Sequence, residues 1–175
     1  PRRRMTQVFS PRLRQAPKRY EQSYQQSTMK ISKGDIFSIQ TKKGLGYMQF
    51  VETTEFGDYV RILDHISDSI NQSDVDKLER WCITFVIKPA LRRKIISFIG
   101  NYNLPLEFKI QEYARSEHNV RGEFLGWHIV NRKTLQRQLK NSLTQEEIKL
   151  SPSGFWNDTL IIERLESDWK LSEWK

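Results

Sequence analysis

Seven basic residues in the first twenty positions have the clearest chemical potential in this sequence. They are Arg2, Arg3, Arg4, Arg12, Arg14, Lys18 and Arg19, and no acidic residue lies among them. Their side chains can neutralise phosphates, and the rings of Phe9, Tyr20 and Tyr24 can stack on bases. The segment therefore predicts binding to DNA, RNA or another acidic partner. A solubilising tail, a targeting segment or residues foreign to the natural protein are the alternatives.

A second basic group lies in the middle of the chain. It consists of Arg92, Arg93 and Lys94, with Lys88 close before them. Because the preceding apolar run predicts a buried strand, we expect this group at the rim of the fold. There it either extends the basic surface of the first segment or forms a solvated bend.

The sequence lacks the motifs of common catalytic and nucleotide-binding sites. It contains no G-x-S-x-G, no G-x-x-x-x-G-K-[ST] and no G-x-G-x-x-G. Its acidic pairs, Glu146-Glu147 and Asp74 with Asp76, lie in polar surroundings, which favours solvated carboxylates over general acids and bases. We therefore predict a protein that is not an enzyme and that uses no cofactor.

The possible metal ligands are few and scattered. The three histidines, His65, His118 and His128, form no H-x-H or H-E-x-x-H pattern. A site built from His118, His128 and Glu123 needs three separate segments to converge. The single cysteine, Cys82, lies in an apolar run and is expected to be buried as a small hydrophobic residue. We predict no metal site.

Charge is divided unevenly along the chain. The formal net charge is +8, and the seven basic residues of the first twenty leave only +1 for residues 21–175. The low cysteine content suits a reducing compartment, and no stretch approaches the ~20 apolar residues of a membrane helix. We therefore predict a cytoplasmic protein that contacts no membrane, with a basic, low-complexity arm at 1–28 and a single domain at 29–175.

The pattern of residues 29–175 predicts an α+β fold, with a curved antiparallel β-sheet or partial barrel and C-terminal helices. Strands separated by short glycine turns are expected at 36–39, 47–51 and 59–63. Further strands are expected at 83–87, 95–99, 106–110 and 125–129. Residues 90–99 fit a single helix as well as they fit a bend and a strand.

The C-terminal third changes to a helical period. Leu135, Leu139 and Leu143 recur every four residues, which suits a helix. Residues 144–147 fit a capping box, and Asn157 or Asp158 is expected to cap a last helix that runs to residue 168.

Three tryptophans are candidates for contact with a protein partner. They are Trp127, Trp156 and Trp169, and tryptophan is the residue type most enriched at binding hot spots. Packing in the core is the alternative for each, because aromatic side chains also fill hydrophobic interiors.

Short signatures in residues 30–170 resemble the Imm26 immunity-protein family of bacterial polymorphic toxin systems. They are Lys33–Ile39, Gly46-Tyr47, Phe85–Pro89, Ile99-Gly100, Leu104-Pro105, Phe155–Asn157, Leu160, Glu163-Arg164 and Asp168-Trp169. The resemblance implies a compact α+β protein that binds and silences a cognate toxin, without a cofactor and without chemistry. Phosphotriesterase activity is also associated with this family, which adds a small phosphotriesterase-like hydrolase as a more remote alternative.

One property departs from a simple immunity role. Inhibitors of nucleases are expected to be acidic, because they face cationic sites. A nearly neutral domain with a basic arm therefore implies a toxin that is not a nuclease, an inhibitor that binds away from the active site, or recruitment to a nucleic-acid-bound assembly.

Overall fold

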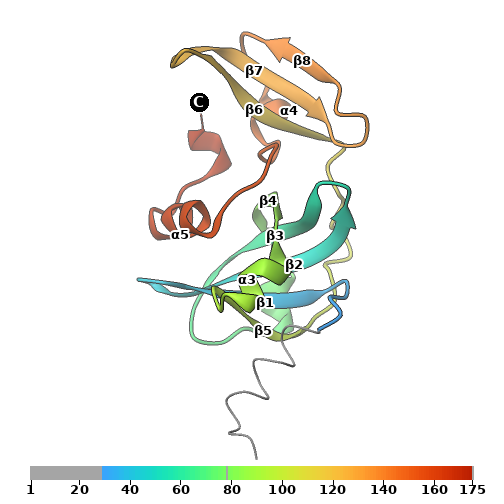
Figure 1. Ribbon diagram of the computed structural model, residues 1–175, viewed down its shortest axis with the longest axis vertical. Helices are drawn as coiled ribbons and strands as arrows, with labels where there is room; N and C mark the ends of the chain where they lie inside the picture. The colour runs from blue at the N-terminus through green and yellow to red at the C-terminus, as the bar shows by residue number, and fades with distance from the viewer. Residues whose placement is uncertain (1–28, 78, 175) are drawn as a thin grey trace, which may run out of the picture.

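The computed structural model describes residues 29–77 and 79–174, and it contains two antiparallel sheets with short helices (Figure 1). The α+β class, the antiparallel strands and the C-terminal helices are confirmed. The strands divide into a five-stranded and a three-stranded sheet, whereas the sequence predicted one sheet or partial barrel. The basic arm at 1–28 lies outside the described residues.

The five-stranded sheet has the strand order β4-β3-β2-β1-β5. Its strands are β1 (Asp35–Thr41), β2 (Gly44–Thr54), β3 (Gly57–Ile66), β4 (Glu79–Phe85) and β5 (Ile96–Asn101). Two-residue turns join β1 to β2 and β2 to β3, and each is followed by a glycine with positive φ, +124° at Gly44 and +132° at Gly57. Glycine adopts this conformation without steric cost, so the predicted hairpins form where the glycines allow the chain to reverse.

The main core lies on one face of this sheet. Alternate strand residues such as Phe37, Met48 and Ile62 are fully buried there, beneath α3 (Ile87–Arg92) and α5 (Asp158–Glu166). The strand predicted at 83–87 ends at Phe85, and the chain then turns into α3. Pro89 lies in the first turn of α3, where its missing N–H leaves no helical hydrogen bond unmade. The predicted alternative of one helix over 90–99 is wrong, because β5 begins at Ile96.

The opposite face of the five-stranded sheet buries a polar group. Arg61 is fully buried and donates hydrogen bonds to Gln49, Glu79 and the main-chain carbonyls of Val75 and Lys77. These partners come from β2, β4 and the connection that holds α2 (Gln72–Val75). The guanidinium therefore fixes the long polar connection between β3 and β4 against the sheet.

The three-stranded sheet has the order β6-β7-β8, with β6 at Tyr113–Val120, β7 at Glu123–Asn131 and β8 at Arg137–Lys140. The strand expected at 125–129 belongs to β7. The strand expected at 106–110 is wrong, because those residues lie in the irregular connection before β6.

The helix expected from Leu135, Leu139 and Leu143 is also wrong. The Asn131 side chain accepts hydrogen bonds from the N–H groups of Lys133 and Thr134, and Leu135 has a left-handed φ of 58°. This tight turn reverses the chain, so Leu139 enters β8 opposite His128. Side-chain capping of the turn and strand pairing outweigh the helical spacing of the leucines.

The C-terminal region begins with α4 (Gln145–Ile148), whose predicted capping box is formed by Thr144 and Glu147. Residues 151–156, the bridging segment, then run from one sheet to the other. Ser151 and Ser153 exchange main-chain hydrogen bonds with Arg115 of β6, and Trp156 donates its N–H to Thr84 of β4. Asn157 caps α5 as predicted, although α5 ends at Glu166 instead of residue 168. A 3-10 turn, η1 (Leu171–Glu173), follows.

All five tryptophans form one continuous cluster between the sheets. The ring centroids are 5.8 Å apart for Trp81 and Trp156, 5.2 Å for Trp81 and Trp169, 6.1 Å for Trp169 and Trp174, and 5.2 Å for Trp174 and Trp127. Offset and edge-to-face contacts at such distances stabilise aromatic pairs beyond their burial. The cluster therefore links β4, the bridging segment, the chain that follows α5 and β7 in one apolar unit.

A buried arginine joins the C-terminal turn to the three-stranded sheet. The Arg115 guanidinium lies 4.7 Å from the ring centroids of both Trp127 and Trp174, and it donates hydrogen bonds to the carbonyls of Leu150, Leu171 and Trp174. Burial away from water lowers the pKa of Arg115 to about 10. Its charge is thus balanced mainly by carbonyl dipoles and aromatic faces.

Candidate functional site

The two outer edges of the five-stranded sheet differ in their coverage. The outer side of β4, the covered edge, accepts the bridging segment through the Thr84–Phe155 bridge and the Trp156 N–H. The outer side of β5, the open edge, pairs with no strand among the described residues (Figure 1). An open strand edge presents unpaired N–H and C=O groups, so it is a template for another extended segment.

The open edge lies beside a concentration of positive charge. Lys88, Arg92, Arg93 and Lys94, the basic cluster, are all exposed on α3 or in the turn that joins α3 to β5. None of the four forms an ion pair with another described residue. No described residue neutralises these four charges, so they are available to a partner.

Local hydrogen bonds hold the basic cluster in place. The N–H groups of Arg93, Lys94 and Ile95 donate to the carbonyls of Pro89, Leu91 and Ala90, which closes the end of α3. Lys94 has a left-handed φ of 58°, a conformation that often ends a helix. This turn sends the chain directly into β5, so the cations precede the open edge by only a few residues.

Two apolar side chains are exposed on β5. Phe98 is 38% exposed and Ile99 is 41% exposed, although both belong to β5. One side of the Phe98 ring is supported by Phe37, with centroids 5.9 Å apart. The pairing register of β1 with β5 shifts between Ile36 and Phe37, so this edge is irregular. The site therefore combines free backbone groups, exposed apolar surface and unpaired cations.

The predicted tryptophan contacts lie elsewhere. Trp127 and Trp169 are only 4% and 8% exposed, and Trp156 is half-buried in the same cluster. For the first two, the alternative of core packing is the one observed, because the aromatic cluster between the sheets buries them. A role for these tryptophans in partner binding has no support from their surroundings.

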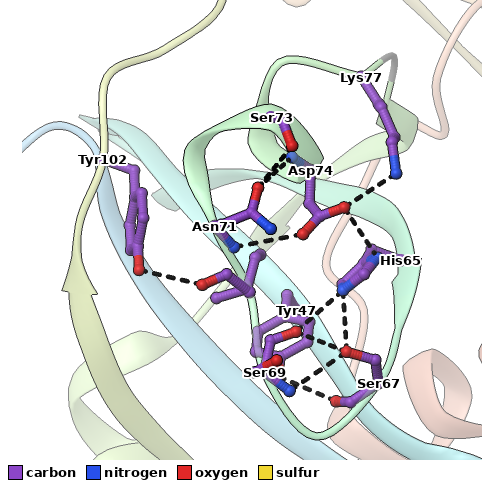
Figure 2. A network of polar contacts seen from close by, with 10 residues as sticks. Tyr47, His65, Ser67, Ser69, Asn71, Ser73, Asp74, Lys77 and Tyr102 are labelled. Atoms are coloured by element: carbon purple, nitrogen blue, oxygen red, sulfur yellow. Dashed lines mark hydrogen bonds and ion pairs between the residues drawn. The ribbon is translucent and has the colours of Figure 1, made fainter.

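A Ser–His–Asp arrangement, which the sequence analysis missed, spans the end of β3, the loop that follows it and α2 (Figure 2). His65 Nε2 is 3.0 Å from Ser67 Oγ, and His65 Nδ1 is 3.5 Å from Asp74 Oδ1. A hydrogen bond from Lys77 is the main cause that lowers the pKa of Asp74, with smaller effects from the Asn71 N–H and from His65. The residue types and the order of contacts are those of a hydrolase triad.

The hydrogen bonds around Ser67 indicate a structural role for this arrangement. Ser67 Oγ donates to the Ser69 carbonyl at 2.5 Å, and His65 Nε2 lies 3.0 Å from the same carbonyl. A carbonyl only accepts, so the Ser67 hydroxyl proton is directed to Ser69 and not to His65 Nε2, whereas a nucleophilic serine must give its proton to the histidine. Tyr47 closes the network by donating its O–H to the Ser67 carbonyl (Figure 2). The group fastens a loop, and no G-x-S-x-G signal marked it in the sequence.

The structure brings two of the three predicted metal-ligand candidates together. The rings of His118 and His128 are 4.5 Å apart between centroids, whereas no three His, Cys, Asp or Glu side chains gather into a ligand group within the described residues. Glu123 therefore does not complete the set.

Cys82 is buried as predicted, and burial raises the pKa of its thiol to about 12.

The remaining predicted site residues are outside the described part of the chain. They are Arg2, Arg3, Arg4, Arg12, Arg14, Lys18 and Arg19. Of the predicted nucleic-acid contacts, the structure therefore places only Arg92, Arg93 and Lys94, all in the basic cluster.

The described helices are all too short or too polar to cross a membrane. In comparisons with known proteins, no family model matches this chain, and no curated protein or solved structure matches it either.

Proposed function

We propose that this chain is a non-enzymatic, immunity-type cytoplasmic protein that binds and silences a protein partner, a cognate toxin. The open edge is the proposed docking site. The single observation that carries the proposal is the coincidence on β5 of an unpaired strand edge, exposed Phe98 and Ile99, and the adjacent basic cluster. Addition of a strand to such an edge is a recurrent mode of protein recognition.

The charges specify the kind of partner. Four cations beside the edge repel a second copy of the same edge, because the like charges would meet. The same cations attract a segment that carries aspartate or glutamate and raise its rate of association. The partner that fits best is therefore an extended, acidic segment of another protein, whose apolar residues cover Phe98 and Ile99.

This assignment also accommodates the overall charge. A basic docking site does not suit the phosphate-binding face of a nuclease, which is itself cationic. It suits a toxin with an acidic surface, or an acidic segment away from the active site of a nuclease. The proposal thus retains two of the three alternatives that the charge of the sequence left open.

The test is rescue from a candidate toxin, chosen among the products of the genes next to the one that encodes this chain. Wild-type protein is expected to restore growth when the toxin is co-expressed, and Arg92→Glu/Arg93→Glu/Lys94→Glu is expected to abolish rescue. A matched control is Lys109→Glu/Arg121→Glu/Lys133→Glu, which reverses three exposed cations elsewhere on the molecule. Rescue by both variants, or loss of rescue by both, would contradict docking at the open edge.

Nucleic-acid association is the second candidate, and the unpaired state of the basic cluster is the observation that favours it. Four cations on one rim can contact phosphates, and the basic arm supplies seven more. Deletion of residues 1–28 separates the candidates. A nucleic-acid protein would lose most of its affinity for a DNA or RNA duplex and much of its salt dependence, whereas an immunity-type protein would keep its toxin affinity.

A phosphotriesterase-like hydrolase remains the more remote alternative. It gains no support from the described residues, since they contain no group of three metal ligands. Turnover of phosphate triesters by the purified protein would be the observation in its favour.

A further inference from the structure

Two histidines face each other on neighbouring strands of the three-stranded sheet. In the pairing of β6 with β7, Ser116 lies opposite His128 and His118 lies opposite Gly126, so the histidines are diagonal neighbours on one face. Their ring centroids are 4.5 Å apart, and the ring planes differ by 56°. This spacing is close enough for each ring to present one nitrogen to a shared ion.

The backbone makes room for this contact. Gly126 has a φ of +138°, and a Cβ there would lie 2.5 Å from the carbonyl oxygen of Lys140 on β8. Glycine is thus required at this position, and it leaves no side chain opposite His118. The register also shifts between His118 and Asn119, which turns the end of β6. The histidine pair is therefore fixed by the strands and not by a mobile loop.

The ring nitrogens of the pair are unoccupied by the described chain. Neither His118 nor His128 forms a hydrogen bond or ion pair with another described residue, although both side chains are half-buried. His65 is the contrasting case, because its two ring nitrogens contact Ser67, Ser69 and Asp74. The two half-buried imidazoles thus contact each other, and no described residue uses their ring nitrogens.

A positive charge lies close to the pair. Arg137 of β8 is opposite Val130, so its side chain is on the same face of the sheet as His128. This charge opposes a bound cation, so removal of Arg137 should strengthen binding.

We propose that His118 and His128 form a two-histidine site for a borderline divalent transition ion, with Cu²⁺ bound more tightly than Ni²⁺ or Zn²⁺. Imidazole suits these ions, and the Irving–Williams order places copper highest. The remaining coordination positions are filled by water or by a ligand from another molecule. This site is independent of the open edge, because it lies on the other sheet.

The test uses the full chain without a histidine tag. Titration with Ni²⁺ and Cu²⁺ should show saturable binding, and a tenfold excess of ion over its Kd should raise the unfolding midpoint by roughly 3–6 °C.

His118→Gln or His128→Gln should weaken binding by roughly tenfold or more, and His65→Gln, the matched control, should leave it unchanged. Arg137→Gln should tighten binding by roughly twofold to fivefold, the effect of one exposed charge.

Two outcomes would overturn the proposal. One is wild-type affinity in both His118→Gln and His128→Gln, and the other is the absence of saturable binding to the wild type. If a variant fails to fold, substoichiometric Cu²⁺ added to the wild-type protein decides the matter by NMR. The imidazole signals of His118 and His128 should broaden before those of His65, and preferential broadening of His65 would refute the site.

Discussion

The two edges of the five-stranded sheet use the same kind of backbone but meet different surroundings. The covered edge at β4 receives the bridging segment, which also pairs with β6 and so joins the two sheets. The open edge at β5 receives no described strand and is flanked by the basic cluster. The bridging segment thus closes one edge of each sheet. Among the described residues, the opposite edges, at β5 and β8, have no partner strand.

This difference between the two edges predicts that substitutions at one affect mainly stability and substitutions at the other mainly binding. Residues at the covered edge are buried together with the tryptophan cluster, so changes there should cost folding free energy. Residues of the basic cluster are exposed and unpaired among the described residues, so changes there should cost binding and little stability. Substitutions in the two regions test this division.

Loss of the Arg115 side chain should have the largest effect on stability. Arg115→Ala leaves three carbonyl groups, of Leu150, Leu171 and Trp174, without their donor and opens a space between two tryptophan rings. We expect a loss of about 3 kcal/mol or more in the free energy of unfolding, measured by urea denaturation. Arg92→Ala in the basic cluster is the matched control, with an expected change within about 0.5 kcal/mol. Equal effects of the two substitutions would contradict the division.

Loss of the Ser151 hydroxyl should have an intermediate effect. Ser151 Oγ accepts a hydrogen bond from the buried N–H of Cys82 at 3.0 Å, which ties the bridging segment to β4. Ser151→Ala should destabilise the fold by about 1–3 kcal/mol, the cost of an unsatisfied buried donor. It should also accelerate labelling of the Cys82 thiol by a disulfide reagent. Ser153→Ala is the control, and unchanged labelling in Ser151→Ala would show that this hydrogen bond does not maintain the covered edge.

The buried thiol of Cys82 should make stability fall at alkaline pH. Burial raises its pKa from an ordinary 9.0 to about 12. The folded protein then keeps a proton that the unfolded chain releases, so this stabilisation is complete below pH 9 and is lost as pH rises toward 12. Between pH 8 and 9.8 the unfolding free energy of the wild type should fall more steeply than that of Cys82→Ala, by at most about 1.4 kcal/mol per pH unit. Parallel curves would contradict a fully buried, protonated thiol.

Charge reversal in the basic cluster should have the smallest effect on stability. Because Arg92, Arg93 and Lys94 are exposed and form no described ion pair, Arg92→Glu/Arg93→Glu/Lys94→Glu should change the unfolding free energy by less than about 1 kcal/mol in total. Urea denaturation checks this directly. A larger loss would mean that the cluster supports the fold, and its effect on binding would then no longer identify a docking site.

Local patterns in the sequence predicted the parts of the fold that depend on local interactions. The hairpins of β1 to β3 follow from alternating apolar residues and from Gly44 and Gly57, and α5 follows from its cap at Asn157. The failures involve pairing between distant residues. Leu139 joins a strand because β7 is available to pair with it, and the division into two sheets depends on which strands meet.

The candidate site was predicted only in part, for the same reason. The basic cluster is visible in the sequence as Arg92-Arg93-Lys94, but the open edge beside it is a property of strand order. His118 and His128 are ten positions apart, and only the register of β6 with β7 brings them into contact. Burial of the tryptophans likewise required the C-terminal turn to return to β7.

Amide hydrogen exchange of the free protein and of its complex with the proposed toxin partner tests the central claim most directly. Strand addition at the open edge would give new protection to amides of β5, Ile96–Asn101, while the already paired amides of β4 remain unchanged. New protection confined to the three-stranded sheet, with β5 exchanging as in the free protein, would show that the partner docks elsewhere.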